Sequence, residues 1–140
     1  MFWDSSALVP LLVAERRSAE LTSVLTSDRE VTVWWATPVE CLSAIYRFHR
    51  DQPLSQTALA LAIERMRALV EDADTVAPTD QVRRRAGRIV ATHSLRAADA
   101  LQLAAALVWC EEQPSGETVV SLDDRLRGAA SREGFSVLPA

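Results

Sequence analysis

Residues 1–10 decide the fold, and they read Met1-Phe2-Trp3-Asp4-Ser5-Ser6-Ala7-Leu8-Val9-Pro10. An apolar start runs into a carboxylate, two hydroxyls and an apolar helical pattern. That order predicts a short buried strand, a polar turn and the start of a helix. Asp4 then stands at the carboxyl tip of the strand, where open α/β sheets bind ligands. A carboxylate in that place is either a helix cap or a reacting group.

The same phrase recurs near the other end, as Thr118-Val119-Val120-Ser121-Leu122-Asp123-Asp124. Two strands that each carry an Asp at the tip can build one acidic site. Between them, strand-like and helix-like patterns alternate along the chain. Strands are expected at 31–35, 75–77, 118–122 and 135–138, and helices at 7–14, 16–25, 38–49, 55–71, 80–92, 97–112 and 125–133. This alternation predicts a parallel sheet covered by helices on both faces.

Two details concern the helix starts, and a third concerns a strand. Ser5 or Ser6 is expected to cap the first helix, with Pro10 tolerated in its first turn. Thr37-Pro38-Val39-Glu40 has the form of a capping box, in which Thr37 is the cap and Glu40 its partner. Trp34 and Trp35 are predicted to point to opposite faces of a strand, one into the core and the other against a helix or a nucleic-acid base.

The bulk composition bounds the function. The 140 residues fit one domain, 1–140, and 49% of them are hydrophobic, which is enough for a core. No apolar run is long enough to span a membrane and no signal-peptide pattern is present, so we expect a cytoplasmic protein. A net charge of −4 gives no global basic footprint for nucleic acid, although all 15 basic residues are Arg, whose planar group suits phosphate.

Nucleophilic and zinc chemistry find little support. Cys41 and Cys110 are isolated in apolar helical stretches and are interpreted as core thiols. His49 and His93 lie far apart and belong to no zinc-binding pattern. Acidic residues are therefore the main candidates for chemistry.

Four carboxylates stand at the ends or starts of predicted elements: Asp4, Glu40, Asp99 and Asp123. Each has an ordinary explanation, because acids near helix N-termini gain about 0.3–1 kcal/mol from the helix dipole. That explanation is favoured for Glu40 and Asp99 taken singly, and is about even for the other two. Taken together, the four acids indicate one shared site, because strand C-termini and helix N-termini lie at the same edge of a parallel sheet.

Such a cluster needs either protonation or a cation. Two carboxylates about 4 Å apart repel by roughly 4 kcal/mol at an effective dielectric near 20, more than capping returns. An oxygen-only set without His or Cys suits Mg²⁺ or Mn²⁺. The chemistry indicated is metal-dependent hydrolysis of a phosphodiester.

The chain resembles the PIN-domain ribonucleases, in particular the VapC-like toxins of type II toxin–antitoxin systems. Four sequence motifs carry the resemblance, and they occur along the chain in the same order as in the family. They are Phe2-Trp3-Asp4-Ser5-Ser6-Ala7-Leu8-Val9; Pro38-Val39-Glu40; Leu95-Arg96-Ala97-Ala98-Asp99-Ala100-Leu101-Gln102-Leu103-Ala104; and Val120-Ser121-Leu122-Asp123-Asp124-Arg125-Leu126 with Ala129-Ala130, Gly134-Phe135 and Leu138-Pro139. The resemblance covers the whole chain and implies a three-layer α/β/α fold with a parallel sheet of about five strands.

The resemblance also implies functional roles. Asp4, Glu40, Asp99 and Asp123 would be the catalytic quartet, and Asp4, Asp99 and Asp123 would hold Mg²⁺ or Mn²⁺. The supporting residues would be Ser6, Ser121 and, with a strong alternative as an ordinary first-turn acid, Asp124. The expected activity is endoribonuclease cleavage by metal-activated water, with RNA as substrate, a small antitoxin as partner and a homodimer as assembly.

Arginines are the candidates for RNA binding. Arg84 and Arg88 share a helix face, and Arg96 closely precedes Asp99. A solvated, salt-bridged helix face is the alternative and is favoured for most basic residues outside Arg96.

Three other function classes are the alternatives. The chain is alternatively a catalytically silent PIN-like binding module, against which the intact acids argue. A receiver-type phosphoacceptor domain also carries an acidic pocket, but it needs a late Lys, and this chain has none. A phosphatase with an Asp nucleophile would want a second Asp where Ser6 stands.

Overall fold

The computed structural model describes residues 1–140 and contains one five-stranded sheet. All neighbouring strands pair in parallel, in the order β3-β2-β1-β4-β5. Phe2 of the central strand pairs with Thr32 on one side and Val119 on the other. The strands are β1 (Phe2–Trp3), β2 (Thr32–Trp34), β3 (Asp74–Val76), β4 (Thr118–Val120) and β5 (Ser136–Leu138).

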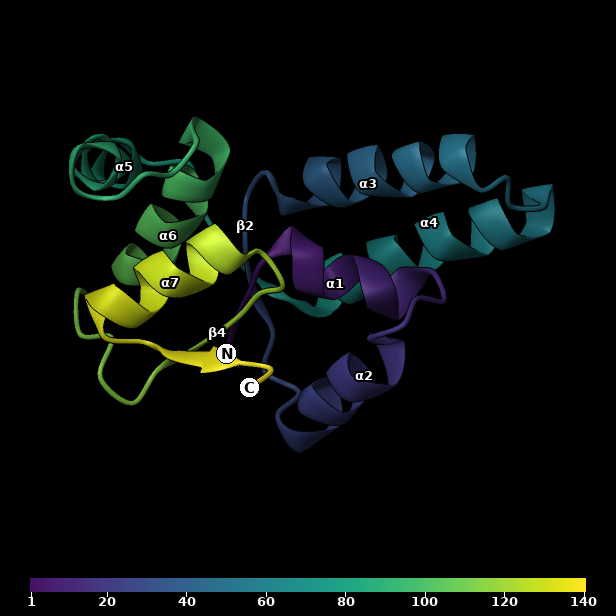
Figure 1. The fold of residues 1–140 in the computed structure, drawn as a ribbon, viewed down its shortest axis with the longest axis horizontal. Helices are drawn as coiled ribbons and strands as arrows, with labels where there is room; N and C mark the ends of the chain where they lie inside the picture. The colour runs from purple at the N-terminus through teal and green to yellow at the C-terminus, as the bar shows by residue number, and fades with distance from the viewer.

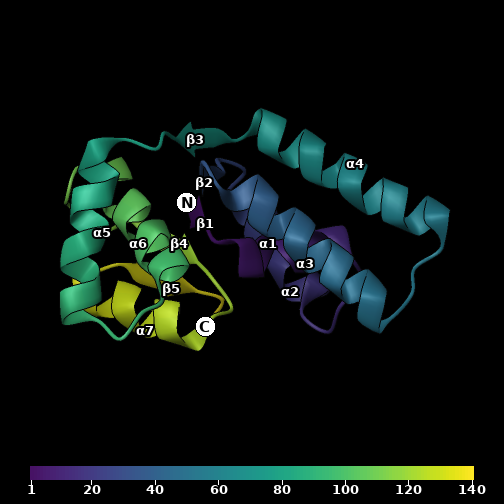
Figure 2. The same ribbon diagram turned by 90° about the horizontal axis from the view of Figure 1, so that it is seen from above.

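Helices cover both faces of this sheet and give the expected three-layer α/β/α fold. Figures 1 and 2 show α5, α6 and α7 gathered on one side and α1 to α4 on the other. The helices are α1 (Ser5–Leu12), α2 (Ser18–Ser27), α3 (Thr37–Asp51), α4 (Gln56–Asp72), α5 (Asp80–Thr92), α6 (Ala97–Trp109) and α7 (Asp124–Glu133). No helix is long and apolar enough to span a membrane.

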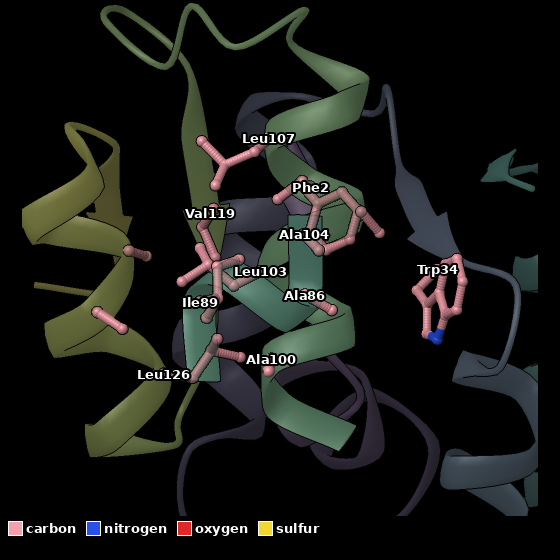
Figure 3. Close-up of a cluster of buried hydrophobic side chains, with 14 of the residues drawn as sticks. Phe2, Trp34, Ala86, Ile89, Ala100, Leu103, Ala104, Leu107, Val119 and Leu126 are labelled. Carbon is pink, nitrogen blue, oxygen red and sulfur yellow. The ribbon is translucent and has the colours of Figure 1, made fainter. Parts of the chain in front are cut away.

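The central strand divides the core in two, because successive strand residues point to opposite faces. Phe2 packs with residues of α5, α6 and α7, among them Leu103 and Leu107 (Figure 3). Trp3 packs on the other side, with residues of α1 to α4. α6 carries a run of buried residues from Gln102 to Leu107, as its Ala/Leu-rich sequence predicts for a helix packed on several sides. Both faces of β1 are thus fully buried, which fixes the position of its C-terminal end.

Two of the predicted helix starts are wrong. The N-cap of α1 is Asp4, whose side chain accepts from the backbone N–H of Ser6, so neither serine is the cap. α1 ends at Leu12, and Pro10 lies in its second turn. Thr37 is the first residue of α3 instead of its cap, and no capping box forms. The carboxylate of Glu40 is therefore free to point elsewhere.

Two further predictions needed correction. Trp34 is buried in β2, but Trp35 follows the strand in a turn and is 59% exposed, so it does not pack into a helix interface. α6 ends at Trp109 and not at Glu112, because Glu111 and Glu112 adopt positive φ angles of 53° and 61° and turn the chain. The fold class, the strand order along the chain and the remaining elements agree with the sequence prediction within about three residues.

Candidate active site

Asp4 is a buried hub between the C-terminal ends of β1 and β4. Only 5% of the residue is exposed. Its Oδ2 accepts hydrogen bonds from Ser6 N at 3.3 Å, from Ser121 Oγ at 2.9 Å and from Ser6 Oγ. Its Oδ1 has one long contact, with Ser5 Oγ at 3.5 Å. One oxygen is thus tied into the protein, and the other is available to a ligand.

Ser6 and Ser121 connect Asp4 to the turn between β4 and α7. Ser6 Oγ accepts from Leu122 N at 2.8 Å, and Ser121 Oγ accepts from Asp123 N at 3.1 Å. Both hydroxyls use their own protons toward Asp4 Oδ2. These two chains of hydrogen bonds connect the C-terminal end of β1 to the C-terminal end of β4. It gives the two predicted supporting serines a defined structural place.

Asp123 is the N-cap of α7. Its Oδ1 accepts from Arg125 N and Leu126 N, both at 2.9 Å. The ordinary capping role therefore occupies one oxygen and leaves the second. Asp124, the first residue of α7, is exposed, which agrees with the plain first-turn alternative for that residue.

Glu40 is held by a residue that the sequence analysis did not single out. Gln102 Nε2 donates to Glu40 Oε2 at 2.6 Å across 62 positions of sequence. Gln102 is 1% exposed, and its Oε1 has no hydrogen-bond partner. The available signal was one amide side chain in an Ala/Leu-rich helix, three residues after Asp99 and hence on a similar face.

Three of the four acids line one cavity of about 630 Å³, which we call the acid cavity: Asp4, Glu40 and Asp99. Asp99 also lines a second cavity together with Asp123 and Arg96. The four acids therefore gather along one edge of the sheet, at the C-terminal ends of β1 and β4 and the N-terminal ends of α3 and α6. Arg47, from the third turn of α3, lies on the wall of the acid cavity.

The acids perturb one another. Burial raises the pKa of Asp4, against hydrogen bonds from Ser6 and Ser121 that lower it, and the charge of Asp123 raises it further. Burial raises the pKa of Glu40, against hydrogen bonds from Gln102 and Ser5. The pKa of Asp99 rises through burial and through the charges of Asp123 and Asp4. A nearby cation would relieve all three shifts.

The donor set fits a hydrated divalent cation. Asp4, Glu40 and Asp123 each have one oxygen held by protein donors, which aims the carboxylate and leaves the other oxygen. No three His, Cys, Asp or Glu side chains converge closely enough to form a finished metal cage. Mg²⁺ does not require one, because it keeps several waters and is usually bound through one or two carboxylates. All-oxygen ligation also matches Mn²⁺.

The predicted RNA-binding arginines fall in different places. Arg96 lines the second cavity beside Asp99. Arg88 lines a separate cavity between α5 and α7, and Arg84 is exposed on α5 outside the cavities described here. Their neighbours Arg83 and Arg85 pair with carboxylates, as the salt-bridged alternative predicted.

The family follows from sequence similarity over nearly the whole length. Residues 1–131 match the profile described as PIN domain. The chain belongs to the PIN domain family. This PIN domain is 32% identical over 142 aligned positions to two proteins of Mycobacterium tuberculosis, Ribonuclease VapC45 and Ribonuclease VapC49. Each alignment covers 100% of this chain and 95% of the relative.

Solved structures support the same fold for this PIN domain. PAE2754 from Pyrobaculum aerophilum superposes with a TM-score of 0.65 at 18% identity, over 98% of this chain and 82% of the other. FitAcB from Neisseria gonorrhoeae superposes with a TM-score of 0.66 at 16% identity, over 99% and 96% of the two chains. The identified family and the three-layer fold are those that the sequence phrases predicted.

Proposed function

We propose that this PIN domain is a Mg²⁺- or Mn²⁺-dependent endoribonuclease, the toxin of a toxin–antitoxin pair. The observation that carries the proposal is the gathering of four acids, from distant parts of the chain, along one edge of the sheet. Two full-length relatives named as VapC ribonucleases support RNA as the substrate.

The residues divide into ligands and a base. Asp4, Asp99 and Asp123 would hold the hydrated cation, in part through its bound waters, and each has an oxygen free of backbone donors. When bound, the cation supplies a Lewis acid that makes a nearby water more acidic and stabilises charge on the phosphate. Glu40, anchored by Gln102, would accept the proton of the water that attacks phosphorus opposite the leaving oxygen. Ser6 and Ser121 keep Asp4 in place throughout.

The same proposal includes partners and location. A small antitoxin and a second copy of the chain are the protein partners that a VapC-type toxin implies. Val39 lines the acid cavity, and Trp35 and Tyr46 are exposed just before α3 and along it; the three side chains offer apolar surface for such contacts. An RNA substrate and two unpaired cysteines fit the cytoplasm. One sheet with a core on each face supports treating residues 1–140 as one domain.

The test is metal-dependent cleavage of RNA. Purified wild type, Asp4→Asn and the control Asp51→Asn, which changes an exposed residue at the end of α3, are incubated with a panel of structured RNAs. We expect cleavage by wild type and Asp51→Asn with Mg²⁺ or Mn²⁺, no cleavage with EDTA, and a loss of at least about 100-fold in Asp4→Asn. Cleavage that survives EDTA or Asp4→Asn would contradict the proposal. RNA binding without cleavage under every metal condition would favour the silent binding module.

A further inference from the structure

A row of cavities leads away from the acidic site along α7. The second cavity, already described, shares Asp124 and Arg125 with a third, and the third shares Thr92 and His93 with a fourth, between α5 and α7. α5 and α7 lie on the same side of the sheet (Figures 1 and 2). Neighbouring cavities share lining residues, so they form a row that starts at Asp99, which we call the groove. Arginines recur along it, and the arginine track is defined as Arg96, Arg125, Arg132 and Arg88.

None of the four track arginines forms an ion pair with a carboxylate, unlike Arg17, Arg83 and Arg85. The side-chain hydrogen bonds of Arg132 go to Nδ1 of His93. The third and fourth cavities also contain three carboxylates, but Glu112 and Glu133 are already engaged by Arg85. Asp124 is the one that remains. Across the third and fourth cavities, four arginines therefore face three carboxylates, on a chain with a net charge of −4. The second cavity, where the row starts, adds Asp99 and Asp123 of the acidic site.

A glycine keeps the groove open at its middle. Arg125 and Arg132 are seven residues apart on α7, so they share a face and lie about 10 Å apart along the helix axis. Gly128 lies between them on the wall of the third cavity. A Cβ at Gly128 would meet nothing closer than Arg132 Nη1 at 3.6 Å, an ordinary contact. Core packing therefore does not require this glycine, although glycine inside a helix costs about 1 kcal/mol relative to alanine.

The lining distinguishes between two kinds of partner. Leu95 is the one hydrophobic residue of the third cavity, and the fourth has none. A bound protein segment buries apolar side chains at the centre of its interface. A polar groove with spaced guanidinium groups instead suits a chain of phosphates.

We propose that the arginine track binds the RNA backbone on one side of the cleavage point, so that the strand runs from the acid cavity along α7 toward α5. This inference rests on the proposed endoribonuclease function and adds a direction to it. It assigns RNA contacts to Arg125 and Arg132, which the sequence analysis did not single out, and it leaves out Arg84.

Two variants test the track, one through charge and one through shape, both in the Asp4→Asn background to prevent cleavage. The probe is an unstructured, fluorescein-labelled 20-nucleotide RNA, followed by fluorescence anisotropy from 0.05 to 0.3 M salt. The charge variant is Arg125→Ala/Arg132→Ala, which removes two phosphate contacts. We expect it to reduce the slope of log K against log salt by about 1.4 and to weaken RNA binding about 20-fold at 0.1 M salt. The control Arg65→Ala/Arg67→Ala removes two exposed arginines of α4 and should leave the slope within about 0.3.

The shape variant is Gly128→Leu, which adds bulk without changing charge. We expect weaker RNA binding, by threefold or more, with an unchanged salt slope. The control Gly87→Leu lies on α5, where a Cβ meets nothing within 4 Å, and should bind like the parent.

The two failures are distinguishable. If both arginine pairs change binding equally, or if Gly128→Leu binds like the parent, the track is overturned and the groove faces another partner, such as a protein. Cleavage by the protein with an intact Asp4 would still stand in that case. If the Asp4→Asn parent protein binds no RNA and the wild type cleaves none, both the arginine track and the proposed function are contradicted.

Discussion

The contact between Gln102 and Glu40 leads to a prediction in which stability and activity separate. Replacing Gln102 by Leu removes the Nε2 donor that lies 2.6 Å from Glu40 Oε2. A hydrogen bond to a charged group contributes about 1.5–3 kcal/mol. The same substitution removes the buried Oε1, which has no partner and costs about 1–3 kcal/mol. The two terms nearly cancel, so we expect the free energy of unfolding to change by less than about 1 kcal/mol.

Activity should respond differently. Without the amide, the Glu40 carboxylate loses the donor that aims it into the acid cavity. Residues that orient the groups at a metal site typically change affinity or activity by about 10- to 100-fold when they are replaced. We therefore expect Gln102→Leu to lower the initial rate of RNA cleavage by about 10- to 100-fold while the protein stays folded.

The assay combines urea unfolding, initial cleavage rates and calorimetric titration with Mn²⁺. Gln102→Met serves as a second variant of similar length without a donor, and Gln56→Leu, at the exposed start of α4, serves as the control. A cleavage rate and a Mn²⁺ affinity that both remain within twofold of wild type would refute the positioning role. A loss of stability above about 3 kcal/mol would refute the cancellation.

Three further predictions concern stability. Asp4→Asn should stabilise the metal-free protein by about 1–2 kcal/mol, because it removes a buried charge that Asp123 repels, and a melting temperature lower than that of wild type in EDTA would contradict this. The folded-state pKa of Asp4 is raised above its ordinary 3.8, so its contribution to stability is fully present below about pH 4 and is lost as pH rises through the folded value. The difference in melting temperature between wild type and Asp4→Asn in EDTA should therefore widen from pH 4 to pH 8, and it should shrink with excess Mg²⁺. A difference that stays constant with pH would contradict this prediction. Leu103→Ala should destabilise by about 2–5 kcal/mol in urea unfolding, because Leu103 is fully buried between α6 and the sheet, whereas the half-exposed Leu61→Ala should change stability by less than about 1 kcal/mol.

The sequence by itself determined the order of the helices and strands, the parallel sheet covered by helices on both faces, and the edge of that sheet at which the acids meet. These follow from local physics. The alternation of apolar residues distinguishes strand from helix within about ten residues, and parallel strands joined by helices present their carboxyl ends at one edge. Asp4 and Asp123 stand directly after apolar strands, so their common edge required no long-range information.

Only the tertiary structure decided what each side chain does at that edge. The Thr37-Pro38-Val39-Glu40 pattern supports a capping box as well as a site role for Glu40. In the structure α3 starts one residue earlier than a Thr37 cap requires, and Glu40 contacts Gln102 instead. Asp4 is both cap and hub because Ser121, 117 residues away, donates to it. Such pairings depend on the rotation of each helix about its axis and on rotamers set by packing, which local periodicity does not encode. The groove that joins Arg96 to Arg88 likewise exists only because α5 and α7 lie together on one face of the sheet.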